Sequence, residues 1–437
     1  MTGDFQASDF RSLLKAFLRV GLLSFGGPAG QIALMHRELV EERRWIGEED
    51  YLHALNFCHL LPGPEAQQLA TWIGWRLHGL RGGLAAGLLF VIPGALVILV
   101  LSALYAVAAQ LDWFEALFLG VKAAVLAIVA QALIRIAGRA LNTGFKKALA
   151  LAAFVALFLF DLPFPLIVLG AGALGMAVAA TRPGWLALVP ASGPGENGPR
   201  PWRASLVAVL VWGGVWALPL LVVLATLGPG HVLWDIGLFF SQLAVVTFGG
   251  AYAVLAYMAQ EAVQGYGWLV PGEMADGLGL AETTPGPLIM VTQFVGYLAA
   301  FRAPEPFTPF VAGLIGAGLT TWVTFAPCFL WIFAFAPWID RMAHATRLKG
   351  GLAALTAAVV GVIANLTVWF ALHVLFAQVS QAWFGPVRLY MPEWASLDWR
   401  AAVLAAVACL LVFGARWSVV RVLGVAAIGG LVFGAIG

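Results

Sequence analysis

The chain has 437 residues, of which 62% are hydrophobic and 11% are charged, and its formal net charge is +2. Charged residues make up about a quarter of an ordinary soluble domain, so this composition excludes a soluble globular protein. A net charge this small also provides no basic field for a nucleic acid, and the expected surroundings are a lipid bilayer. Several apolar runs reach about 20 residues, the length that crosses the hydrocarbon core as a helix, and they predict an all-α polytopic membrane protein.

The first part of the chain is expected to open with two interrupted helices. The breaks are Phe25-Gly26-Gly27-Pro28 and Leu61-Pro62-Gly63-Pro64, each inside an apolar stretch. A proline has no amide donor and its ring clashes with the preceding turn, so each helix must stop and restart there. The helices expected in this part are 10–24, 28–44, 50–60, 64–79, 84–108, 114–136, 148–160 and 164–181.

A segment rich in proline and glycine, residues 182–203, separates two halves of the chain and has the composition of a linker. The span that follows it, 204–228, has no counterpart in the first half. We therefore divide the chain into a first repeat (1–182), a linker with a connecting transmembrane helix (183–230) and a second repeat (231–437). The second repeat is expected to contain two interrupted helices, 232–264 and 269–301, followed by spans at 308–336, 350–375, 401–414 and 417–436.

The two halves share a register. Pro62 and Pro285 lie 223 residues apart, and the same spacing relates Gly26-Gly27 to Gly249-Gly250. A register that holds without a gap from position 25 to position 64 is hard to obtain by chance, so we interpret the chain as two copies of one unit. Because one unmatched span lies between the copies, the second copy is expected to be inverted in the membrane.

Loop charges predict the orientation. If the broken elements re-enter the membrane, most arginines and lysines of the loops, including the cluster at 135–147, fall on one side. That side is the cytoplasm by the positive-inside rule, and it also holds the N-terminus. If the broken elements cross fully, the Arg37 to Arg44 loop moves to the opposite side instead.

Interrupted helices in inverted repeats are typical of secondary transporters, which bind their substrate near the middle of the membrane. Each restart points unpaired N–H groups and a partial positive charge into the interior, which favours an anion. Glycines let a substrate approach these amides closely, so Gly63→Val is expected to block its entry. The alternative is that glycine and proline merely kink packed helices. The predicted substrate-binding residues at the breaks are Gly26, Gly27, Pro28, Pro62, Gly63, Pro64, Gly249, Gly250, Pro285, Gly286 and Pro287.

Lys122 lies inside the expected span 114–136, with no acid in the neighbouring turns. A charge at membrane depth is costly, so Lys122 is a further candidate that would neutralise the bound anion, and Lys122→Ala is expected to abolish transport. The alternatives are that its side chain reaches the membrane interface or pairs with Glu115. Its counterpart in the second copy is Thr356, so the charge would be supplied by one copy only.

Three further residues could couple transport to protons. Glu65 follows Pro64 directly, although an acid at that position also simply stabilises the start of a helix. His59 and Glu282 occupy the same repeat position, three residues before the first proline of each break. A location at a helix boundary would be enough to explain both.

No motif predicts a catalytic, metal or cofactor site. Cys58, Cys328 and Cys409 fall in apolar segments without metal-ligand spacing. The segment Gly170–Gly175 fits a dinucleotide-binding fingerprint, but it lies inside an apolar span, where small residues favour close helix packing. The chain is therefore not expected to be an enzyme.

The motifs at the breaks resemble those of the chromate ion transporter family in its long, two-domain form. The similarity covers both halves, and the combination is specific although a single Pro-Gly-Pro would be weak. The matching stretches are Ser24–Pro28, Leu61–Ala70, Gly120–Val125, Thr247–Tyr252 and Ala281–Pro287. One departure is Ala251, which stands where the first copy has Pro28, so the two breaks are not equivalent.

The resemblance implies a carrier in the bacterial inner (plasma) membrane that exports chromate, an oxyanion with the shape and charge of sulfate, using membrane energy rather than ATP. The expected coupling ion is the proton, moved in antiport, and faces of small residues leave room for a homodimer. The alternatives are a permease for sulfate or another oxyanion and, from a different class, an anion channel.

Overall fold

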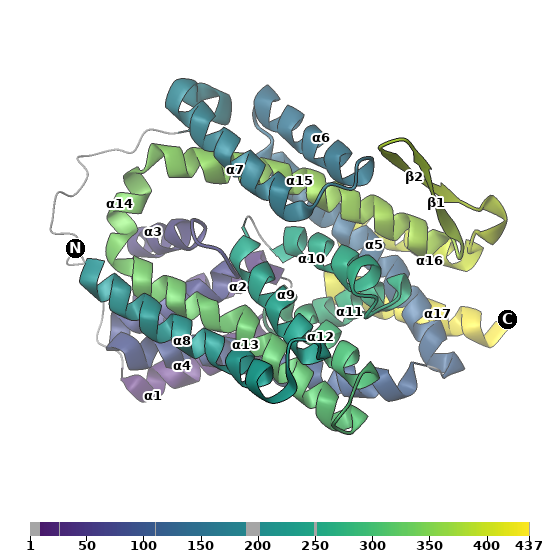
Figure 1. Ribbon diagram of the computed structural model, residues 1–437, viewed down its shortest axis with the longest axis horizontal. Coiled ribbons are helices and arrows are strands. Elements are labelled where there is room, and N and C mark those ends of the chain that lie inside the picture. Colours follow the sequence, from purple (N-terminus) through teal and green to yellow (C-terminus); the bar gives the residue numbers. More distant parts are fainter. Residues whose placement is uncertain (1–8, 26, 110, 189–201, 249–250, 437) are drawn as a thin grey trace. The chain divides into compact units, whose positions relative to one another are not determined.

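A computed structural model of the protein describes residues 9–25, 27–109, 111–188, 202–248 and 251–436 (Figure 1). These residues are almost entirely helical, which confirms the all-α prediction, and seven of their helices are long and apolar enough to cross a membrane. The chain is therefore a polytopic membrane protein. Gly26, Gly249, Gly250 and most of the predicted linker lie outside the described residues.

The chain forms two compact units, and each combines segments from both halves of the sequence. Unit 1 contains Met1–Ala103, Pro190–Val254 and Thr284–Ala345, and unit 2 contains Leu104–Val189, Leu255–Thr283 and Thr346–Gly437. The units are thus defined by packing. The sequence-based division into a first repeat, a linker with one helix and a second repeat, with boundaries at 182/183 and 230/231, describes similarity between the halves instead of packing. It stays a prediction.

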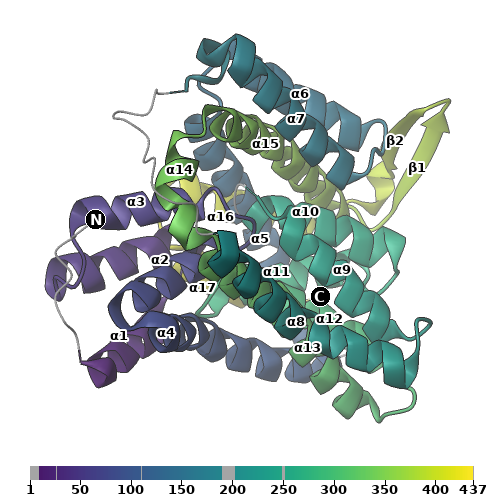
Figure 2. The same ribbon diagram turned by 60° about the vertical axis from the view of Figure 1, so that its left-hand side comes forward.

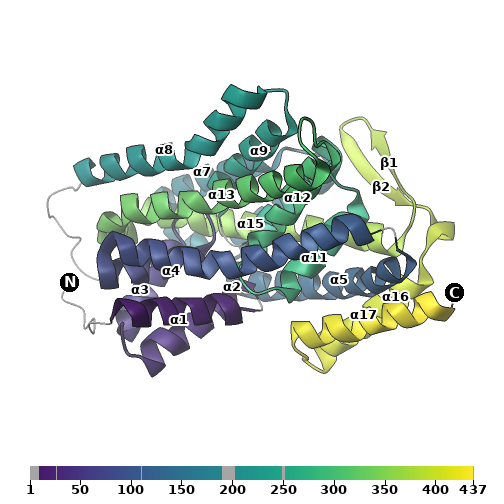
Figure 3. The same cartoon turned by 90° about the horizontal axis from the view of Figure 1, so that it is seen from below.

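Unit 1 is built around α13 (Pro309–Phe335), which packs against α12 (Val291–Arg302), α8 (Trp202–Leu227) and α9 (Val232–Val246) (Figure 3). The contact between α13 and α8 is pinned by two reciprocal indole hydrogen bonds. Trp216 Nε1 donates to Val323 O at 3.1 Å, and Trp322 Nε1 donates to Val215 O at 3.0 Å. The other elements of unit 1 are α1 (Phe10–Leu23), α2 (Gly27–His36), η1 (Arg37–Glu42), α3 (Glu48–Cys58), most of α4 (Glu65–Ala108), the start of α10 (Ala251–Gln260), η4 (Leu288–Met290), η5 (Ala336–Trp338) and α14 (Ile339–His344).

Unit 2 is built around α5 (Asp112–Ala140) and α15 (Thr346–Leu375). Helices α6 (Gly144–Phe158) and α7 (Phe164–Thr181) lie along α15 (Figure 2), whereas α11 (Pro271–Thr283), α16 (Trp399–Cys409) and α17 (Val419–Ile436) pack on α5. Small residues allow the close approaches: a Cβ at Gly175 would lie 2.4 Å from Gly350 O, so the glycine-rich segment of α7 serves helix packing. Unit 2 also contains η2 (Pro183–Leu186), η3 (Glu261–Gly265), β1 (Val379–Phe384), β2 (Val387–Pro392), η6 (Trp394–Ser396) and η7 (Leu410–Gly414).

Two local features differ from the sequence-based expectation. Helix α4 is interrupted at His78 and Gly79, where the helix 64–79 was expected to end, and Gly79 has a φ of 59°. The helix then continues through Gly82-Gly83, whereas it was expected to restart only at residue 84. The antiparallel hairpin β1–β2 was not expected at all. Its strands are too short and too mixed in polarity to span a membrane. The turn between them contains Gly385, whose φ of 61° is adopted easily only by a residue without a side chain.

Candidate functional site

All four expected helix breaks are present. Helix α1 ends at Leu23 and α2 begins at Gly27; α3 ends at Cys58 and α4 begins at Glu65. In the second half, α9 ends at Val246 before α10 begins at Ala251, and α11 ends at Thr283 before η4 begins at Leu288. The described residues between the helices of the four breaks belong to unit 1.

The breaks are joined in crossed pairs by backbone hydrogen bonds. The Gly63 amide donates to Thr247 O at 2.8 Å, and the Gly286 amide donates to Ser24 O at 3.0 Å. Gly63 and Gly286 are 223 residues apart, as are Ser24 and Thr247, so the same contact is made twice at the repeat spacing. Each break of one half is thus held by a break of the other half.

The glycines at these crossings are required by the backbone. Gly63 and Gly286 have φ angles of 110° and 94°, which residues with a side chain rarely adopt. A Cβ on Gly63 would lie 3.0 Å from Gln68 Nε2 and 3.1 Å from Cys328 Sγ. Because the two glycine amides already donate to carbonyl oxygens, the donors that face a ligand must come from the helix starts and from side chains.

Neutral polar side chains are buried around the breaks. Gln31 Nε2 donates to Gly286 O at 2.5 Å, and Gln68 Nε2 donates to Pro62 O at 2.6 Å, so two glutamines satisfy carbonyls that the breaks release. The Ser24 side chain is 1% exposed, and its hydroxyl has no hydrogen-bond partner. A buried hydroxyl without a partner is costly in a resting protein and is available as a donor to a ligand.

The helix starts differ in charge. The first turns of α2, α10 and η4 contain no acidic residue, whereas α4 begins with Glu65. The first amides of a helix lack intrahelical acceptors and carry a partial positive charge, so three of the starts offer amides to an anion without a competing carboxylate. Glu65 is half-buried and opposes an anion at the fourth start while it is ionised.

Lys122 is paired with a carboxylate within unit 2. Its Nζ lies 3.4 Å from Asp276 Oδ2, and the Tyr105 hydroxyl donates to the same oxygen at 2.7 Å. Asp276 is only 3% exposed, and its second oxygen, Oδ1, is buried without a partner. Neither Asp276 nor Tyr105 was identified from the sequence, because Asp276 is 154 residues from Lys122 and no local pattern joins α5 to α11.

An open cavity of about 300 Å³ gives Lys122 access to its surroundings. The lysine side chain is 24% exposed. The charged residues that line the cavity with Lys122 are Asp112, Glu115, Asp398 and Arg400, so three carboxylates face two cations there. Glu115, which the sequence offered as an alternative partner of Lys122, shares this cavity with it, but the ion pair of Lys122 is with Asp276.

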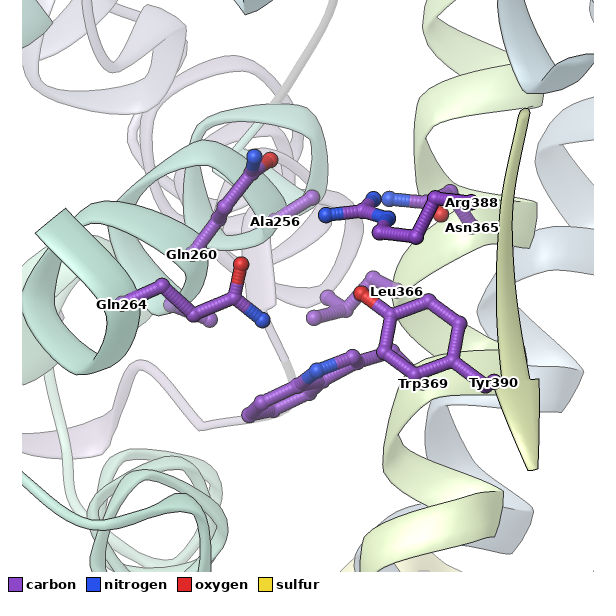
Figure 4. A pocket seen from close by; sticks show the side chains of 9 residues that line it. Ala256, Gln260, Gln264, Asn365, Leu366, Trp369, Arg388 and Tyr390 are labelled. Atoms are coloured by element: carbon purple, nitrogen blue, oxygen red, sulfur yellow. The ribbon is translucent and has the colours of Figure 1, made fainter. Parts of the chain in front are cut away.

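A second buried ion pair lies elsewhere in unit 2. Arg388 Nη1 is 2.6 Å from Asp161 Oδ1, and Arg388 Nη2 donates to Leu157 O at 2.9 Å. In Figure 4 the Arg388 guanidinium points toward Gln260, across a cavity lined also by Trp369. This cavity is about 10 Å³, the room of a single water molecule, so it is too small for a tetrahedral oxyanion.

The remaining candidates differ in burial. Pro28, Pro62 and Pro285 are half-buried, whereas Gly27, Pro64 and Pro287 are buried. His59 is exposed at the end of α3, and Glu282 is 5% exposed near the end of α11. Across the described ranges, no group of three or more metal-ligating side chains is close enough to hold a metal ion.

Comparison with known proteins identifies relatives along most of the chain. The family model described as "Chromate transporter" matches residues 11–176 and 234–431. A chromate transport protein of Pseudomonas aeruginosa is 34% identical over 82% of this chain and 80% of its own length. Chromate transport proteins of Cupriavidus metallidurans (30% identical, 83% of this chain and 82% of the relative) and, under the name "probable", of Synechococcus elongatus (28%, 83% and 84%) are also similar. No solved structure shows a significant match.

Proposed function

The chain belongs to the chromate transporter family, and on that premise we propose that it exports chromate across the bacterial inner membrane as a secondary transporter with a cytoplasmic N-terminus. The observation that carries the proposal is the family match to both halves of the chain, whose described residues include seven helices able to cross a membrane. The two matched segments begin at residues 11 and 234, which are 223 residues apart. This spacing supports two copies of one unit. We propose that the second copy is inverted, because one unmatched span separates the copies.

The oxyanion is bound in unit 1, between the crossed breaks. The proposed site comprises the first amides of the restarting helices, the Ser24 hydroxyl and the residues of the breaks. The prolines and glycines of the breaks keep the backbone there accessible to a ligand. Lys122 is left outside this site, because its charge is already balanced by Asp276 and its cavity contains more carboxylates than cations. A site without a fixed counter-ion binds a dianion weakly enough to release it again, as a carrier must.

The membrane potential supplies the driving force for export. A negative interior expels anions, and the potential is worth about 2.3 kcal/mol per charge per 100 mV, so about 4.6 kcal/mol for a dianion at 100 mV. Exchange with an incoming proton would add to this force. ATP is not needed for accumulation on this scale.

Two other functions are kept as alternatives because chromate and sulfate both present four oxygens and two negative charges. A sulfate permease would move its anion inward and would need the proton gradient to overcome the membrane potential. An anion channel would show flux that does not saturate with concentration.

The test is uptake of labelled chromate into inverted membrane vesicles that contain the protein, with and without an imposed potential and with sulfate as competitor. Saturable accumulation that depends on the potential is the expected result, and the inhibition constant for sulfate would measure selectivity. Transport of sulfate without chromate in energised vesicles would instead support the permease, and loss of saturation would support a channel.

A further inference from the structure

The Asp276 carboxylate is incompletely satisfied for a buried charge. Lys122 and Tyr105 both contact Oδ2, and Oδ1 has no partner. A buried carboxylate is stable as an anion only when its oxygens are paired and hydrogen-bonded, so the unpartnered oxygen weakens the ionised form. The carboxylate of the other ion pair, Asp161, is 32% exposed on its side chain and accepts from Gln260 as well as Arg388. Asp276 is thus a buried acid of unit 2 that a proton would stabilise more than it would stabilise Asp161.

Few ionisable groups act on Asp276. Lys122 of α5 and Tyr105 of α4 favour its anion, and Glu273 on its own helix opposes it. The ionisable residues of α15 and α17, the other helices packed on α11, lie in their terminal turns: Arg347, Lys349, His373 and Arg421. Burial outweighs the two favourable contacts and raises the pKa of the Asp276 carboxyl to about 7.

Lys122 connects this acid to the outside of the protein. Asp276 is 3% exposed, whereas the Lys122 side chain is 24% exposed and lines the cavity of about 300 Å³. The Asp112, Glu115 and Asp398 carboxylates of that cavity attract protons and repel oxyanions, and Arg400 balances one of them. The cavity is therefore suited to deliver protons and unsuited to deliver the substrate.

We propose that Asp276 is the proton-binding site that couples transport, and that Lys122 relays the proton to it from the cavity. A proton passes from Lys122 Nζ to Asp276, which breaks an N–H bond and forms an O–H bond. The neutral amine then takes a proton from a hydronium ion in the cavity, which leaves a water molecule, so that the pair gains one proton and one positive charge in total. Tyr105 is a positioning residue that keeps the carboxylate beside Lys122. This inference rests on the proposed proton-coupled transport.

The assignment is tested with the full chain in proteoliposomes, by two assays on the same preparation. One measures exchange of labelled chromate without any gradient, and the other measures accumulation driven by a pH gradient. Asp276→Asn is expected to retain exchange and to lose gradient-driven accumulation down to the level of empty liposomes. Lys122→Arg keeps the ion pair but cannot release a proton, so it should likewise retain exchange and lose accumulation.

Asp161→Asn is the matched control, because it removes the acid of the other ion pair in unit 2. It is expected to lower stability while keeping the wild-type ratio of the two assays. Gradient-driven accumulation by Asp276→Asn at the wild-type level would overturn the proposal.

A second readout separates this proposal from the proposed function. Infrared difference spectra of the purified protein, recorded between about pH 6 and about pH 8, should contain a protonated carboxyl band that Asp276→Asn removes. If the wild type transports no chromate but shows this band, the proposed function fails and the proton site stands. If the band is unchanged in Asp276→Asn, the proton site fails whatever is transported.

Discussion

The two units bury polar groups of different kinds. Unit 1 buries neutral side chains around its helix breaks, with Gln31, Gln68 and Ser24 near the crossings. Its buried acid Glu38 is paired with Arg19 and Arg43, away from the breaks. Unit 2 instead buries four charged residues among those described: Lys146, Asp276, Glu282 and Arg388. Neutral groups can bind and release an anion without a change of protonation, whereas a buried carboxylate responds to pH. This difference is the reason why we propose unit 1 for the oxyanion and unit 2 for the proton.

The largest effect is expected from Lys122→Met. The change leaves the Asp276 carboxylate buried without its counter-ion, which should cost about 3–5 kcal/mol in free energy of unfolding at about pH 8. Denaturant titration in detergent measures this, and the double variant Lys122→Met/Asp276→Asn should recover most of the loss. Equal stabilities of the single and double variants would show that the pair carries no coupling energy. Lys122→Ala is expected to abolish transport, so the double variant must be assayed with it to distinguish a loss of transport from a loss of folded protein.

Gly63→Ala should destabilise unit 1 by about 1–3 kcal/mol, because the residue would adopt a φ of 110° and its Cβ would press on Gln68 and Cys328. Gly138→Ala is the matched control on the exposed side of α5, where nothing lies within 4 Å, and it should gain about 0.5–1 kcal/mol. Thermal unfolding in detergent compares the two. If Gly63→Ala left the stability unchanged, the backbone would not require this glycine. The remaining explanation would be that it gives the substrate room to approach, the room that Gly63→Val was expected to block.

A smaller effect is expected from pH. The folded pKa of Asp276 lies above that of an unfolded aspartate, so its contribution to stability is present at low pH and is lost as the pH rises toward about 7. The melting temperature in detergent should therefore fall between about pH 5 and about pH 8 more steeply in the wild type than in Asp276→Asn. Identical slopes would mean that Asp276 does not titrate in this range.

Much of the architecture could be predicted from the sequence, because hydrophobic runs and prolines act locally. Pro62 and Pro285 placed two breaks within a few residues, and the family resemblance followed from the same motifs. The interruption of α4 at His78 and Gly79 agrees with the expected end of a helix at residue 79. The restart was placed too late, at residue 84, because Gly82-Gly83 suggested a longer break, although glycine is tolerated within a packed helix. The hairpin after α15 was missed because the sequence-based assignment has no element in residues 376–400, the connection between two expected spans.

The candidate site was predicted less completely, because its contacts join residues far apart in the chain. Lys122 was noticed as a charge within an apolar span, but its partner depends on how α11 packs against α5. The crossed hydrogen bonds of Gly63 and Gly286 follow the repeat spacing, which the sequence contains, yet the acceptors Thr247 and Ser24 could not be identified without the fold. The sequence did contain one signal for this part of the site, because the acid Asp276 lies within a short segment of small and apolar residues.

The central claim is that the oxyanion and the proton bind in different units, and the most direct test is the dissociation constant for chromate of two purified variants at about pH 8. Ser24→Ala should weaken binding about tenfold, since a hydrogen bond to a charged group is worth about 1.5 kcal/mol or more, without loss of stability. Asp276→Asn should bind chromate as the wild type does. Weakened binding in Asp276→Asn together with wild-type affinity in Ser24→Ala would contradict the account and place the oxyanion in unit 2.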